Sequence, residues 1–288
     1  MITFPKLMSS THDAPDGDVT RRSGQMAAVF SGMWVLAMIA VPIARWTMGD
    51  EIIPLMSSLT VILQFLAVFN IGVIGWGVRR TTVAAVLVAI VTFAAEYIGS
   101  KTGFPFGIYS YTASLQPQLG DVPLVIPLAW FMMLLPSWAV ASLIVSRLEN
   151  HLPKSTRYVA FVILSAAAIS AWDLFLDPQM VGWGFWEWQA NTIGPGNYFG
   201  IPWSNYAGWF LTGIVATLVI PPTWLTQLPK RPLIGVYTTV WLLQTIGLAF
   251  FWQQPGPSFF GFIGMGVFSL TAMLAAPGYL SPVRRAPS

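Results

Sequence analysis

Three acidic residues lie inside or at the end of long apolar stretches of this sequence. Glu96 ends one such stretch, and Asp173 and Asp177 end another. An acidic side chain in a hydrocarbon layer costs roughly 2.5–3.5 kcal/mol on insertion, so acids in this position are functional candidates first. Because a desolvated carboxyl group can hold or deliver a proton, the sequence predicts acid–base chemistry at these three residues.

The spacing of the second pair predicts how the two carboxyls lie. Asp173 and Asp177 are four positions apart, so they share one helix face, with Asp173 about 5.4 Å deeper. Asp177 precedes Pro178, which disfavours helical backbone at the residue before it, and we expect the helix to end there. On this interpretation Asp177 is a turn residue near water, whereas Glu96 and Asp173 are desolvated. In the alternative interpretation the acids have no chemical role, and Glu96 is an interfacial residue whose side chain reaches toward water.

The elements that must position these acids are membrane helices. Only 9% of the residues are charged and 55% are hydrophobic, whereas soluble domains carry about 25% charged residues. We therefore expect an all-α polytopic transmembrane bundle over residues 25–278, between a disordered polar tail (1–24) and a short basic tail (279–288). About eight apolar runs are long enough to cross a bilayer, namely residues 25–44, 52–78, 81–98, 122–145, 158–176, 206–225, 233–252 and 258–276.

The basic residues predict the orientation of the bundle. If both termini are cytoplasmic, twelve of the 14 Lys and Arg residues fall in cytoplasmic segments, and Arg45 and Lys101 fall outside. This bias follows the positive-inside rule and supports an even number of spans. We therefore expect a multi-pass protein of the cell membrane with the three acids at the outer end. The net charge of +3 reflects this topology and does not indicate nucleic-acid binding.

Two outer connections, residues 99–121 and 178–205, are long and rich in Gly, Pro and aromatic residues. Segments such as TGFPFGIYSY are too apolar to extend into water, so we expect both connections to fold back as caps over the bundle mouth. A faint internal repeat relates the two connections. Each follows a helix that carries an acid near its end, and each leads into a helix that contains a Trp. The expected substrate contacts are the polar and aromatic residues around this mouth, namely Tyr109, Tyr111, Trp130, Trp203, Asn205 and Trp209.

His and Cys, the usual ligands of zinc and other transition metals, are absent from the stretches around the three acids. The chain has no Cys, and its two His residues are His12, in the polar tail, and His151, in an inner loop. No Gly-rich phosphate-binding loop is found either. We therefore expect neither a metal nor a cofactor at the acids.

Three segments resemble the membrane carotenoid hydratases of the CruF type. They are EYIGSKTGFPFGIYSYTASLQPQLGDVPLVIPLAW (96–130), DLFLDPQM (173–180) and NYFGIPWSNYAGW (197–209). These enzymes hydrate the acyclic end group of γ-carotene, lycopene-like or bacterioruberin-type carotenoids. The resemblance implies addition of water across the terminal 1,2 double bond, which gives a tertiary alcohol without an external cofactor. The implied partners are the carotenoid, the lipid bilayer and other enzymes of the carotenoid pathway.

Hydration of such an alkene fits the predicted acids. It requires a general acid that protonates C2, stabilisation of a tertiary cation at C1, and a bound water. A carboxyl desolvated in a membrane pocket can stay protonated near neutrality and serve as that acid. We expect Glu96 or Asp173 to donate the proton and the other to steady the cation and its water, with a lesser role for Asp177. Aromatic faces around the pocket would add about 0.5–2 kcal/mol each.

Two other functions use the same residues. A membrane polyprenyl transferase would hold a magnesium diphosphate with Asp173 and Asp177, although the sequence has no second Asp-rich motif and few basic residues on that side. A proton-coupled transporter or non-enzymatic carotenoid-binding protein would use the acids as a relay or as ligands. Gain of one water by the pigment distinguishes hydration from both.

Overall fold

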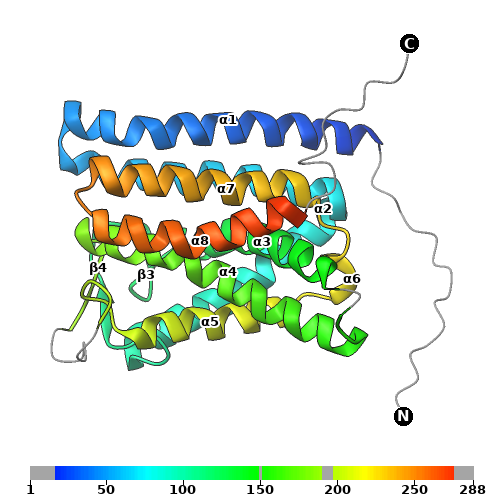
Figure 1. Cartoon of the computed structure of the whole chain (residues 1–288). Helices are drawn as coiled ribbons and strands as arrows, with labels where there is room; N and C mark the ends of the chain where they lie inside the picture. Colours follow the sequence, from blue (N-terminus) through cyan, green and yellow to red (C-terminus); the bar gives the residue numbers. More distant parts are fainter. Residues whose placement is uncertain (1–16, 149–150, 190–196, 276–288) are drawn as a thin grey trace.

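The computed structural model describes residues 17–148, 151–189 and 197–275, which form an all-α bundle with two small sheets (Figure 1). Six of the described helical segments are long and apolar enough to cross a membrane, which confirms the predicted fold class. The helices are α1 (Gly17–Met48), η1 (Asp50–Ile52), α2 (Ile53–Thr102), α3 (Val125–Arg147), α4 (Lys154–Gly182), α5 (Trp203–Leu218), α6 (Pro222–Leu225), α7 (Lys230–Ile246), the π-helical turn η3 (Gly247–Phe251) and α8 (Pro255–Ala275).

The long helix α2 contains two of the predicted spans. Gly77 has φ 74° and ψ 164°, a conformation outside the helical region that glycine adopts at little steric cost. A Cβ atom added at Gly72 would lie 2.9 Å from Thr81 Cγ2, although nine residues of continuous helix would separate the two by about 13.5 Å. The chain therefore reverses at Gly77, and the two halves of α2 correspond to the spans predicted at 52–78 and 81–98.

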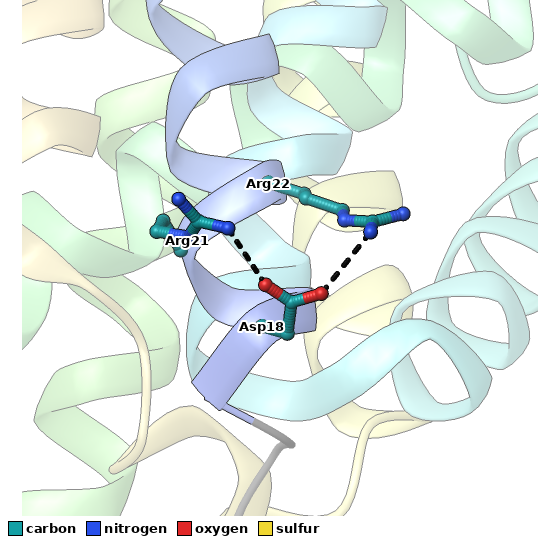
Figure 2. Close-up of polar contacts among 3 residues, drawn as sticks. All are labelled: Asp18, Arg21 and Arg22. Atoms are coloured by element: carbon teal, nitrogen blue, oxygen red, sulfur yellow. Dashed lines mark hydrogen bonds and ion pairs between the residues drawn. The ribbon is translucent and has the colours of Figure 1, made fainter.

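The beginning of α1 differs from the prediction. The helix starts at Gly17, and the Asp18 carboxylate pairs with Arg21 Nη2 (2.9 Å) and Arg22 Nη2 (3.1 Å), as Figure 2 shows. An acid in the first turn with basic residues three and four positions later favours a helix start. The predicted disordered tail is therefore wrong for residues 17–24. Residues 1–16 and the predicted basic tail at 279–288 lie outside the described residues.

The predicted span at 206–225 is divided into two helices. Helix α5 ends at Leu218, and the single-turn helix α6 follows from Pro222. Two consecutive prolines, Pro221 and Pro222, explain the break, because proline lacks the N–H that a continuing helix needs and restricts the residue before it. The apolar composition of the stretch hid this interruption.

The bundle has two distinct ends. Helix α1 begins and helix α8 ends at one end of the bundle, on the right in Figure 1, and the labelled strands β3 and β4 lie toward the other end. Arg80 Nη1 donates to Gln227 Oε1 (3.1 Å) at the first end, which we call the basic end. Arg45 and Lys101 lie at the opposite, strand end. This arrangement agrees with an even number of spans, and a cytoplasmic basic end stays a prediction.

The two long connections meet in one small sheet at the strand end. Strand β1 (Tyr109–Tyr111) pairs antiparallel with β4 (Trp186–Trp188), and β2 (Gln118–Leu119) pairs with β3 (Val122–Pro123). Tyr109 lies opposite Trp188, and Tyr111 lies opposite Trp186. The prediction of two aromatic loops that cap the bundle is confirmed.

The first cap is anchored by Phe106. Its ring is buried, and a Cβ atom added at Gly99 of α2 or at Gly208 of α5 would lie 2.5 Å from a ring carbon. Trp188 Nε1 also donates to the Phe106 carbonyl at 3.3 Å. The missing side chains of the two glycines therefore let the ring pass between α2 and α5 and hold the cap in place.

The tight fit of Phe106 gives a prediction for stability. We expect Gly208→Ala to lower the stability of the protein by about 1–3 kcal/mol, because overpacking a fixed aromatic ring forces neighbouring groups to move. Thermal unfolding in detergent measures this loss of stability. Gly235→Ala in α7 is the control, since a Cβ atom there meets nothing within 4 Å. Equal stability of the two variants would contradict the proposed anchoring.

Candidate active site

Glu96 lies near the end of α2, directly under the sheet. Its Oε2 accepts hydrogen bonds from Tyr109 (2.6 Å) and Tyr111 (2.7 Å), and its Oε1 accepts one from Trp130 Nε1 (3.1 Å). Burial and the neighbouring carboxylate charge raise the pKa of both tyrosines, so both remain phenols that donate. The three donors fix the orientation of the carboxyl group, and each of these hydrogen bonds is stronger to a carboxylate than to a neutral acid.

Asp173 and Asp177 are joined by a residue of α5. Asn205 Nδ2 donates to Asp173 Oδ2 at 2.9 Å and also to Asp177 Oδ2, and Trp186 Nε1 of β4 donates to Asp177 Oδ1 at 3.1 Å. Among the described residues, no basic side chain pairs with either carboxyl. Two adjacent buried carboxyls without a balancing cation resist double ionisation. The pair is therefore suited to retain one proton.

The prediction that the helix ends at Asp177 is wrong. Helix α4 continues through Pro178 to Gly182, and Asp177 is 2% exposed. Pro178 cannot donate to the Leu174 carbonyl, and this carbonyl accepts a hydrogen bond from Tyr198 OH instead (3.0 Å). Because a partner from the second cap replaces the lost hydrogen bond, the helix tolerates the proline and keeps Asp177 inside the bundle.

A small cavity lies beneath the sheet between the acids. It has a volume of about 30 Å³, and a water molecule needs roughly 10–15 Å³ of such space. Glu96 and Asp177 both line it, whereas Asp173, one turn deeper, is not part of its wall. The other lining residues are Phe106, Tyr109, Tyr111, Ile126, Ala129, Trp130, Leu176, Trp186, Trp188, Asn205 and Trp209.

A much larger cavity adjoins the small one. We call it the chamber; it has a volume of about 550 Å³ and lies among α1, α2, α3, α4 and α7. Most of its wall consists of aliphatic and aromatic side chains. Four residues, Ile126, Ala129, Leu176 and Trp186, line both cavities. The end of the apolar chamber therefore lies beside the small cavity that Glu96 and Asp177 line.

Five of the six predicted contact residues line the small cavity, and Trp203 does not. Trp209 stacks on Trp130 with ring centroids 4.1 Å apart. Trp203 is exposed and packs beside Tyr198 and Tyr206, with ring centroids 6.0 and 5.5 Å away. As the first residue of α5, Trp203 points away from the pocket, whereas Asn205 points into it.

The sequence interpretation missed three aromatic residues that line the small cavity, besides the apolar Ile126, Ala129 and Leu176. Phe106, Trp186 and Trp188 all reach the small cavity, and Trp186 is bonded to Asp177. The sequence WEW at 186–188 contains the signal, because alternation of period two is typical of a strand with one buried face. Glu187 is exposed between the two buried tryptophans, as this pattern requires.

The fold and the site define a polytopic membrane protein with desolvated carboxyl groups at the end of an apolar chamber. Comparison with known proteins identifies the family: the family described as carotenoid biosynthesis protein matches residues 56–268, and the chain belongs to it. The resemblance to carotenoid hydratases is confirmed by a relative from Haloarcula japonica, bisanhydrobacterioruberin hydratase. The chain is 34% identical to this relative over 142 residues, which cover 49% of this chain and 45% of the relative. No solved structure matches the chain.

Proposed function

We propose that the protein is a carotenoid hydratase that adds water across the terminal 1,2 double bond of an acyclic ψ-end group. The observation that carries this proposal is the water-sized cavity lined by Glu96 and Asp177 at the end of the chamber. The family and the name of the Haloarcula relative support the same class of reaction. γ-Carotene, lycopene and bacterioruberin-type precursors are the candidate substrates.

The first step is protonation of the alkene. Asp177 donates its proton to C2, the π-electron pair forms the C2–H bond, and a tertiary cation remains at C1. Asp177 is the donor in this proposal because it lines the small cavity and shares Asn205 with Asp173, so that the pair retains one proton. The indole of Trp186, which lines both cavities, would stabilise the cation by about 0.5–2 kcal/mol.

The second step is capture of the cation by water. The water oxygen attacks C1 and forms the C–O bond, and the proton that it releases passes to the Glu96 carboxylate. Tyr109, Tyr111 and Trp130 hold that carboxylate in place. Transfer of this proton back to Asp177 through the cavity restores the starting state. Water is the only co-reactant, and the cycle requires neither a metal nor a cofactor.

The arrangement gives less support to a polyprenyl transferase. Asn205 and Trp186 already engage oxygens of Asp173 and Asp177, and these donors would have to leave before a magnesium ion could bind. Within the described ranges no group of three or more His, Cys, Asp or Glu side chains is placed to hold a metal. A diphosphate site usually needs such a cluster of oxygen ligands.

Expression in a host that accumulates lycopene or γ-carotene tests the proposed function. We expect new pigments whose masses exceed that of the precursor by one water for each hydrated end, with the host lacking this gene as the control. Pigment that co-purifies with the protein unchanged would instead indicate a binding or transport protein. A prenylated product would indicate a transferase.

A further inference from the structure

Four residues of the chamber wall are also exposed on the surface of the bundle. Ile39, Ile43 and Trp46 of α1 are 49%, 51% and 66% exposed, and Ile246 of α7 is 46% exposed. A residue that both lines a cavity and reaches the surface marks a place where the cavity opens. Because all four belong to α1 and α7, the opening lies between these two helices.

The opening faces the hydrocarbon layer. Ile39, Ile43 and Trp46 follow the i, i+4, i+7 spacing of one helix face, and all lie within an apolar helix long enough to cross the membrane. Ile246 is likewise apolar and lies within such a segment. A long polyene is itself dissolved in the hydrocarbon layer, so it can reach this opening without passing through water.

The strand end of the opening is closed by contacts between α1 and the last residue of η3 and the residue after it. The rings of Trp46 and Phe251 lie 5.6 Å apart, and the Arg45 guanidinium lies 5.5 Å from the centroid of the Trp252 ring. Pro42 lies between Ile39 and Ile43, where it removes a backbone hydrogen bond and lowers the cost of bending α1. Helix α1 is thus fastened at one end and weakened beside the opening.

We propose that polyene substrates pass between the bilayer and the chamber through this opening, with Ile39, Ile43 and Ile246 as its rim. The identity of the ligand rests on the proposed function. The end group would enter first and move through the chamber toward Ile126 and Trp186, where the chamber meets the small cavity. The rest of the polyene would remain among the lipids beside α1 and α7.

Cysteine modification tests this path, because the chain contains no native Cys. Ile43→Cys and Ile246→Cys are each reacted with a bulky methanethiosulfonate reagent and reconstituted into vesicles that contain lycopene. We expect both modified proteins to lose most of their pigment uptake and conversion, relative to their own unmodified samples. Uptake is read as lycopene that co-purifies in mild detergent, and a reductant that removes the label should restore both activities.

Leu36→Cys and Leu242→Cys are the matched controls. Both residues are exposed, on α1 and α7 respectively, but neither lines the chamber. Modification there should leave uptake and conversion unchanged. Unimpaired uptake in the modified rim variants, or an equal loss in the controls, would overturn the proposed path. Reversible loss of uptake at the rim in a protein that never forms a hydrated pigment would support the path and contradict the hydratase function.

Discussion

Asp177→Asn should lower the rate of carotenoid hydration by about 10²- to 10⁴-fold, the usual contribution of a general acid. The amide keeps the shape of the side chain but removes the acidic proton. Asp177 has the larger predicted effect of the two aspartates because it lines the small cavity, whereas Asp173 lies behind it. Turnover of lycopene or γ-carotene by the purified protein, followed by mass spectrometry, measures the loss.

Asp121→Asn is the control for this experiment. Asp121 is an exposed acid at the strand end that pairs with Lys101, outside both cavities. The Asp121→Asn variant should retain the native rate of hydration, and all variants should elute as folded protein in size-exclusion chromatography. Near-native turnover by Asp177→Asn, together with inactive Asp173→Asn, would reverse the assignment in favour of the role that the sequence alone predicted for Asp173.

The sequence predicted the spans well because burial in lipid leaves a strong signal. Every stretch that crosses the bundle must be apolar, and the Lys and Arg residues separate its two ends. The boundaries were less predictable. Pro178 normally ends a helix, yet α4 continues because Tyr198, about 20 residues later, supplies a hydrogen bond to the Leu174 carbonyl. Such a tertiary contact has no local signature.

The three acids could be identified from the cost of placing them in an apolar stretch. Which of the three acids line the small cavity could not be identified from the sequence. It depends on how α4 is rotated against α5, and on Trp186, which arrives from the second cap to bond Asp177. The same limit explains Trp203: the sequence places it beside Asn205, but only the start of α5 determines which of them faces inward.

Glu96→Gln should also lower the rate of hydration, by a different route. The variant loses the negative charge that steadies the cation and accepts a proton from water, and we expect the rate to fall by about 10²- to 10⁴-fold. It should also be less stable. Both oxygens of Glu96 accept hydrogen bonds, and the amide of the variant offers only one acceptor oxygen. Its nitrogen faces either the N–H of Trp130 or the hydroxyls of Tyr109 and Tyr111, which must then turn to accept. A buried donor that is left without an acceptor costs about 1–3 kcal/mol.

Removing the Trp130 donor, one of the three that compete for the single amide oxygen, separates the two effects. In the double variant Glu96→Gln with Trp130→Phe, the indole N–H is absent, so thermal stability in detergent should recover toward that of Trp130→Phe alone. The hydration rate should not recover, because the charge and the proton acceptor are still missing. Return of turnover together with stability would mean that Glu96 serves only to hold the cap through Tyr109 and Tyr111. Stable but inactive protein would place Glu96 in the chemistry of water addition.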